Sequence, residues 1–94
     1  MKQICRFTFP PGINRSGIEG QLAQAIISAE CLFGQARARL DAAYVMSSDG
    51  RRLVLDVSNE VGEYIARLFT GLLIRELGEE GFSVERTQGE PVDA

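Results

Sequence analysis

The segment from Pro11 to Gly17 holds the residues best suited to bind a ligand. It joins a strand-like run to a helical pattern, and unpaired N–H groups at a helix N-terminus attract anions. Glycine allows close backbone approach, while amide, hydroxyl and guanidinium groups supply hydrogen-bond donors. We therefore predict a small-molecule or anion site made by Gly12, Asn14, Arg15, Ser16 and Gly17.

The same loop also fits an ordinary capped helix start with turn residues. It lacks the glycine spacing and the lysine of a phosphate-binding P-loop. In this interpretation Ser16 is the N-cap, and Glu19 follows at the spacing of a capping box. Both interpretations remain open on the sequence alone.

A second set of polar residues falls on one face of the predicted sheet. The set comprises Arg6, Thr8, Arg37, Arg39, Asp41, Arg52 and Asp56. Sheets that bind RNA display aromatic side chains on which bases stack, and here Phe7 and Phe9 fall on the other face. The net charge of −3 also disfavours a partner held by phosphate contacts. We expect cross-strand ion pairs on a solvated surface rather than nucleic-acid binding.

Nucleophilic or metal chemistry has little support. Cys5 and Cys31 are the only cysteines, and histidine is absent, so no zinc-ligand spacing exists. Both cysteines lie in apolar runs, and we expect two buried, reduced thiols. Glu79 and Glu80 are more simply a solvated helix end than an acid–base pair. We predict no catalytic residue, no metal and no cofactor, and a protein that is not an enzyme, although small enzymes of similar size leave that alternative open.

Length and composition indicate one folded domain. The chain has 94 residues, of which 45% are hydrophobic and 24% charged, and this is ordinary for a globular protein. We expect a single α+β domain over residues 1–88 and a flexible polar tail over 89–94. The first residues lack a signal-peptide core, and no apolar run is long enough to cross a bilayer. We expect a cytoplasmic protein without membrane contact.

The first half of the chain predicts a strand and a long helix. Alternation over Gln3–Phe9 predicts a half-buried strand, which two prolines end. A helix is expected over Gly17–Phe33, with Gly34 as its stop. Its apolar stripe comprises Ile18, Leu22, Ala25, Ile26, Ala29 and Phe33, widened by Ile27, Cys31 and Leu32.

The segment Ala36–Met46 decides the topology. Every even position is apolar, and this period of two favours a strand, although its Ala and Arg content would also allow a longer helix. Such a strand would lie at a sheet edge and could pair with a second copy to form a homodimer. Arg37 and Arg39 could instead protect that edge. Ser47–Gly50 then predicts a hairpin turn.

The second half predicts two strands around a clear amphipathic helix. The strands are Arg52–Val57 and Phe82–Thr87, and Ser58 or Asn59 caps the helix between them. We expect its glycines, at positions 62 and 71, to pack closely on the sheet. The order of elements predicts a ferredoxin-like βαββαβ sandwich with two helices on one face of a four-stranded antiparallel sheet. The helices would cover Phe7, Phe9, Leu40, Tyr44, Leu53, Leu55 and Val57.

Three segments resemble NIL domains, small ferredoxin-like modules found at the ends of methionine-importer ATPases. They are Arg6–Pro10, Gly50–Val57 and Gly81–Glu85. The chain departs from the NIL pattern in its longer helices. The resemblance, and that to the related ACT domains, implies a regulatory module that binds a small metabolite around the first strand-to-helix loop.

These observations favour a non-enzymatic small-molecule-binding or regulatory module of NIL/ACT-like type. The alternative is a protein-interaction or assembly subunit that forms a homodimer through an edge strand.

Overall fold

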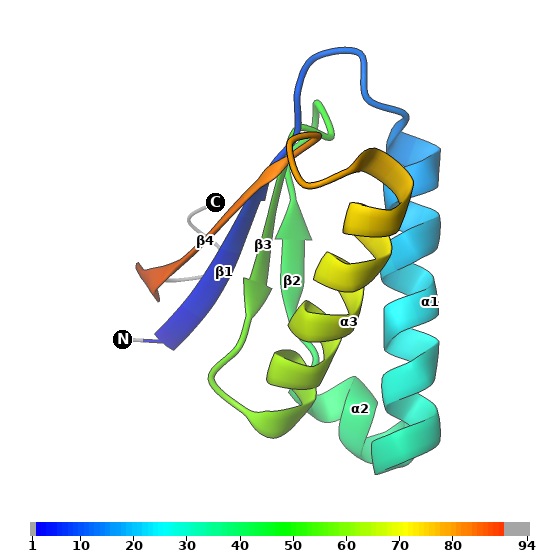
Figure 1. Cartoon of the computed structure of the whole chain (residues 1–94). Coiled ribbons are helices and arrows are strands. Elements are labelled where there is room, and N and C mark those ends of the chain that lie inside the picture. The colour runs from blue at the N-terminus through cyan, green and yellow to red at the C-terminus, as the bar shows by residue number, and fades with distance from the viewer. Residues whose placement is uncertain (1, 90–94) are drawn as a thin grey trace.

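The computed structural model describes residues 2–89. Its elements are β1 (Lys2–Thr8), α1 (Arg15–Phe33), α2 (Gln35–Asp41), β2 (Tyr44–Met46), β3 (Arg52–Asp56), α3 (Glu60–Leu77) and β4 (Ser83–Gly89). The strands form one sheet in the order β2-β3-β1-β4, and every neighbouring pair is antiparallel. Helices α1 and α3 run side by side along one face of it (Figure 1). The predicted α+β class and four-stranded antiparallel sheet are confirmed, and the order is consistent with a ferredoxin-like arrangement.

The prediction of a long strand over Ala36–Met46 is wrong, and residues 2–89 form three helices rather than two. Gln35–Asp41 is a helix, α2, and only Tyr44–Met46 pairs with β3. Alanine, arginine and leucine are strong helix formers, so the alternation of Ala with Arg is compatible with both structures. The short helix buries Ala38.

Side-chain contacts also support α2 as a helix. Arg37 Nε lies 3.6 Å from Asp41 Oδ2 across one turn, and the Arg37 guanidinium lies over the Phe33 ring, 5.0 Å from its centroid. Exposed pairs of this kind each contribute only tenths of a kcal/mol, roughly 0.3–0.5. Together with the buried alanine they favour the helix over an extended edge strand.

The hairpin between β2 and β3 is confirmed. The Asp49 carboxylate accepts hydrogen bonds from the Ser47 hydroxyl at 2.6 Å and the Arg51 N–H at 3.0 Å. These bonds, with a smaller contribution from nearby arginines, hold the pKa of Asp49 below its usual range. Gly50 has a positive φ of 73°, and a side chain there would collide with Arg15. The turn therefore packs against the start of α1.

Phe7 of β1 and Phe69 of α3 are at the centre of the core, with their rings edge to face at 5.0 Å. Five of the predicted sheet contacts are confirmed as buried: Phe7, Phe9, Leu53, Leu55 and Val57. Leu40 is 84% exposed because it lies on the outer side of α2, so its predicted burial is wrong. Tyr44 is 48% exposed because the helices do not fully cover the β2 edge.

The outer side of α1 is more apolar than predicted. Cys31, Ile27 and Leu32 are exposed, so the expectation that they widen the buried face is wrong. The sheet occupies only the side of α1 that carries Leu22 and Ala25, and the opposite side has no element packed on it within residues 2–89. Cys5, in contrast, is buried as expected.

Helix α3 begins close to the end of β3. Asn59 is its N-cap, and the Asn59 Oδ1 accepts a hydrogen bond from the Gly62 N–H at 2.8 Å. An added Cβ at Gly62 would collide with the carbonyl oxygen of Asp56, so the predicted close packing is correct there. Gly71 has open space where a Cβ would lie, and the same prediction is wrong for it.

In the described part of the chain, no helix is both long and apolar enough to span a bilayer. Gly89 still belongs to β4, and the rest of the predicted tail lies outside the described residues.

Candidate functional site

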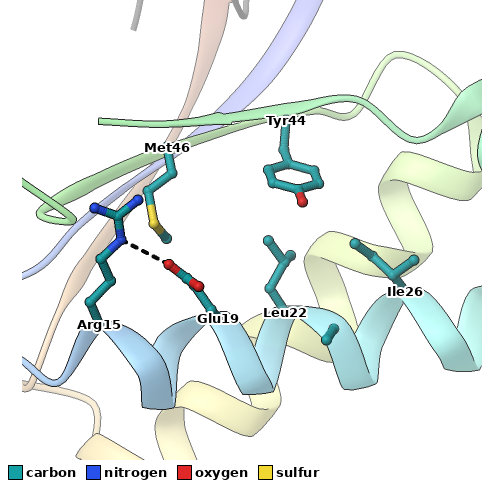
Figure 2. Close-up of a pocket in the computed structure, with 7 residues that line it drawn as sticks. Arg15, Glu19, Leu22, Ile26, Tyr44 and Met46 are labelled. Atoms are coloured by element: carbon teal, nitrogen blue, oxygen red, sulfur yellow. Dashed lines mark hydrogen bonds and ion pairs between the residues drawn. The ribbon is translucent and has the colours of Figure 1, made fainter. Parts of the chain in front are cut away.

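A groove lies between α1 and the edge strand β2. Its volume is about 490 Å³, and it is lined by Arg15, Glu19, Leu22, Ala23, Ile26, Tyr44 and Met46. Figure 2 shows Tyr44 and Met46 pointing from β2 toward α1, with Leu22 and Ile26 pointing back from the helix. We call this site the α1–β2 groove.

The groove exists because two long helices cover a sheet of four strands. Strand β3 lies under the helices with Leu53 and Leu55 fully buried, whereas β2 lies at the sheet edge. Tyr44 and Met46 occupy the helix-facing side of that edge, opposite Leu55 and Leu53 respectively. Their apolar surfaces and those of α1 therefore face each other without filling the space between them.

One end of the groove carries a pair of opposite charges. Arg15 Nε donates to Glu19 Oε1 at 2.8 Å, and Arg15 Nη1 donates to the carbonyl oxygen of Ser48 at 2.8 Å. The second bond fixes the guanidinium against the β2–β3 turn. Among the described residues, neither Arg15 Nη2 nor Glu19 Oε2 has a further hydrogen-bond partner. A cation donor and a carboxylate acceptor are thus both available beside the apolar walls.

The predicted loop site is not brought together as one pocket. Asn14, rather than Ser16, is the N-cap of α1: its Oδ1 accepts a hydrogen bond from the Gly17 N–H at 3.3 Å. The capping-box spacing predicted a helix that begins after Ser16. Helix α1 begins earlier, at Arg15, so the residue before it, Asn14, is the N-cap. Gly12, with a φ of 84°, shapes the turn before it.

Of the five predicted site residues, only Arg15 lines the α1–β2 groove. Asn14 and Gly17 line a smaller cavity of about 210 Å³ between the start of α1 and the end of α3. Gly12 and Ser16 are exposed and line neither cavity. The amide oxygen of Asn14 is already used by the cap, and the other polar side chains that line this smaller cavity are Gln21 and Glu76.

The predicted arginine-rich sheet face is smaller than expected. Arg37, Arg39 and Asp41 belong to α2, so their placement on the sheet was wrong. On the face itself, Arg6 Nη1 lies 3.2 Å from Glu85 Oε1 in the neighbouring strand. This is a cross-strand ion pair of the kind expected, but Ile4, Val54 and Asp56 on the same face are buried, so the expectation of a solvated surface is only partly met.

Asp56 is a buried carboxylate on that face. It accepts hydrogen bonds from the Ser58 N–H at 2.9 Å and the Ser58 hydroxyl at 2.5 Å, and Lys2 Nζ lies 3.3 Å away. Burial alone would raise the pKa of Asp56, but the two bonds from Ser58 and the nearby lysine outweigh it and lower the pKa. Its polar atoms are satisfied within the fold, which makes its role structural.

A second groove, of about 470 Å³, lies between α3 and β4 above Cys5. Burial raises the pKa of the Cys5 thiol, Arg86 opposes this effect and Glu63 reinforces it. The thiol therefore stays protonated and is a poor nucleophile. Arg86 also bonds to Glu63 and, at 2.9 Å, to Gln3 Oε1, so these polar groups hold one another.

Within residues 2–89, no three His, Cys, Asp or Glu side chains lie close enough together to hold a metal ion. No known family model matches the chain, and no curated protein matches it.

Sequence reasoning missed most of the α1–β2 groove. Ile26 and Tyr44 were expected in the core, and Glu19 in a capping box. One signal was present in the sequence: Arg15, Glu19 and Ala23 recur at helical spacing beside the apolar stripe. Which strand faces this side of α1 depends on where β2 lies in the sheet, and local sequence patterns do not encode that position.

Proposed function

We propose that this protein is a non-enzymatic, small-molecule-binding regulatory module, with its ligand site in the α1–β2 groove. One observation carries the proposal: apolar walls from two elements meet a fixed Arg15–Glu19 pair at one end. The groove volume of about 490 Å³ falls within the range of small-molecule sites.

The lining defines the chemistry of the ligand. Leu22, Ile26, Tyr44 and Met46 suit an apolar body, and Arg15 with Glu19 suits a charged or zwitterionic head group. Burying one apolar side chain contributes about 1.5–3 kcal/mol, and a charge-assisted hydrogen bond about as much again. After the cost of immobilising the ligand, we expect dissociation constants in the micromolar to millimolar range.

The NIL-like segments of the sequence support the same class of function. Their resemblance implies a ferredoxin-like regulatory domain that binds a metabolite near the first helix, and Arg15 belongs to both that loop and the groove. On this proposal the domain is cytoplasmic and works by ligand occupancy rather than by chemistry.

A thermal-shift screen with paired tryptophan variants tests the proposal. Ala23 is exposed and lines the groove, whereas the neighbouring Gln24 is exposed and does not line it. Amino acids and small amphipathic acids and amines, up to millimolar concentrations, should raise the melting temperature of the wild type and of Gln24→Trp. They should fail to do so for Ala23→Trp, in which the indole fills the groove. A panel without any stabilising compound, or equal stabilisation of both variants, would contradict the proposal.

Arginine variants test the polar end of the groove. Arg15→Gln should weaken binding of an anionic or zwitterionic ligand by about tenfold, because one charge-assisted bond is lost. Arg75→Gln, on the exposed last turn of α3, is the matched control and should leave affinity unchanged. Equal effects of the two substitutions would mean that Arg15 does not contact the ligand.

A further inference from the structure

The outer edge of β2 presents unpaired backbone groups beside the groove. The Asp56 N–H donates to the carbonyl of Ala43, and the Ser47 N–H donates to the carbonyl of Arg52, both at 2.9 Å. In an antiparallel pair, alternate residues direct their backbone groups toward the partner strand. Ala43, Val45 and Ser47 therefore face β3, and Tyr44 and Met46 direct their N–H and C=O groups away from the sheet.

No described residue pairs with these outward groups, and β2 is the last strand on its side of the sheet. The strand has no proline or lysine to block the approach of another chain. An added strand could bond to Tyr44 and Met46 through both of their backbone groups.

The groove would receive side chains of such a strand. Residues directly opposite one another in an antiparallel pair project on the same face. Tyr44 and Met46 project toward α1, so the added residues opposite them would project into the α1–β2 groove (Figure 2). The residue between them, opposite Val45, would project to the other face.

The two positions differ in chemistry. Beside Tyr44 the groove is apolar, with Leu22 and Ile26 facing it from α1. Beside Met46 lies Arg15, whose guanidinium is fixed by bonds from Nε and Nη1 and presents Nη2. The guanidinium already binds the Glu19 carboxylate through Nε, and its Nη2 can donate to a second carboxylate, as the planar fork of arginine allows.

We propose that the ligand of the groove is an extended peptide segment that adds to β2 as an antiparallel fifth strand. Its pattern is an acidic residue opposite Met46, any residue opposite Val45 and an apolar residue opposite Tyr44. In chain direction this is acidic-x-apolar. The inference rests on the proposed function, because it takes the α1–β2 groove as the ligand site, and it assigns to that site a short peptide segment instead of a single small molecule.

A second copy of the chain fits the edge less well. Two β2 strands paired about Val45 would place Met46 of the partner subunit opposite Tyr44 and bring no carboxylate to Arg15. Both groove positions would then receive the copy's own apolar side chains. The charged end of the groove therefore favours a separate peptide with an acidic residue.

Blocked heptapeptides test the proposal by calorimetry on the whole chain. The probe is acetyl-Ser-Thr-Glu-Thr-Leu-Thr-Ser-amide, and the control of equal composition exchanges its Glu and Leu. The probe should bind about tenfold more tightly than the control. N-methylation of its Leu, which removes an N–H facing β2, should weaken binding about tenfold, whereas N-methylation of the central Thr should change it less than about twofold.

Hydrogen exchange locates the peptide. Bound probe should slow exchange of the Tyr44 and Met46 amides, with no added protection of Val45, whose N–H already faces β3. Equal affinity of probe and control, equal effects of the two methylations, or unchanged exchange at Tyr44 and Met46 would overturn the proposal.

The outcomes also separate this inference from the proposed function. Small amphipathic compounds that stabilise the wild type but not Ala23→Trp, without peptide binding, would sustain the proposed function and overturn the peptide ligand. If neither the small compounds nor the peptide bind, both the proposed function and the peptide ligand are overturned. Protection of Tyr44 and Met46 that depends on protein concentration and needs no peptide would assign the edge to a second copy instead.

Discussion

One added methyl group should have opposite effects on stability at Gly62 and Gly71, two positions of α3. The hydrogen of Gly62 occupies the only space between α3 and the Asp56 carbonyl, whereas Gly71 in the same helix faces open space. Gly62→Ala should destabilise the protein by about 3 kcal/mol through overpacking against backbone. Gly71→Ala should stabilise it by up to about 1 kcal/mol through helix propensity. Urea unfolding measures both, and equal effects of the two substitutions would contradict the close approach of α3 to β3.

Asp56 makes stability depend on pH. Its pKa is lower in the folded protein than the ordinary value of 3.8, so the stability it contributes is present above that value and is lost as the pH falls through the lowered pKa. Asp56→Asn should cost about 1.5–3 kcal/mol at neutral pH, the contribution of hydrogen bonds to a charged group. The deficit should shrink as the pH falls below 3.8 and through the lowered pKa of Asp56.

The control for this prediction is Glu79→Gln, on the exposed segment after α3. Urea midpoints of the three proteins at neutral and acid pH make the comparison. A deficit of Asp56→Asn that stays constant with pH would mean that the charge of the carboxylate contributes nothing.

Among the elements, α2 has a sequence pattern that allows either a strand or a helix, and only the fold decides between them. Leu40 and Ala38 both lie on even positions, which a strand would bury together. In the helix, Ala38 is buried and Leu40 is exposed. Leu40→Gln should change the free energy of unfolding by less than about 0.5 kcal/mol, while Ala38→Gln should cost about 1–3 kcal/mol. A large loss from Leu40→Gln in urea unfolding would indicate that the segment is extended after all.

Local sequence patterns correctly predicted the elements for which the pattern is compatible with one structure only. The alternation in β1 and β3, the apolar stripe of α3, the hairpin at Asp49–Gly50 and the helix end at Gly34 are all present. They failed where two structures satisfy one pattern. The Ala–Arg alternation is compatible with helix and strand, and the contact of Arg37 with Phe33 and Asp41, which supports the helix, arises only after the chain turns at Gly34.

The candidate site was harder to predict because it is made by tertiary contact. Arg15 was found, since it stands beside a helix start in a loop rich in turn residues. Met46 and Tyr44 were assigned to the sheet face, but the groove they form with α1 depends on the incomplete cover of β2. No local pattern reports how much of an edge strand the helices cover.

At the scale of the whole molecule, one layer of helices on a four-stranded sheet produces both the core and the grooves. Helix α3 packs over the central strands through Phe69, and each sheet edge is left partly open. The β2 edge combines apolar walls with a fixed, available guanidinium. At the β4 edge, both carboxylate oxygens of Glu63 of α3 are paired, Oε1 with Arg86 and Oε2 with Arg67, whereas Glu19 in the α1–β2 groove is paired through Oε1 alone. This difference favours a ligand site at the β2 edge.

Amide chemical-shift mapping by nuclear magnetic resonance tests whether the ligand binds in the α1–β2 groove. The labelled protein is titrated with the amphipathic acids, amines and zwitterions of the screen and with the acidic-x-apolar peptide. We predict shifts concentrated on Arg15, Glu19, Ala23, Tyr44 and Met46, with little change around Glu63 and Arg86. Shifts centred on the β4 edge or on the smaller cavity lined by Asn14 and Gly17 would contradict a ligand site in the α1–β2 groove. So would the absence of shifts with all of these compounds.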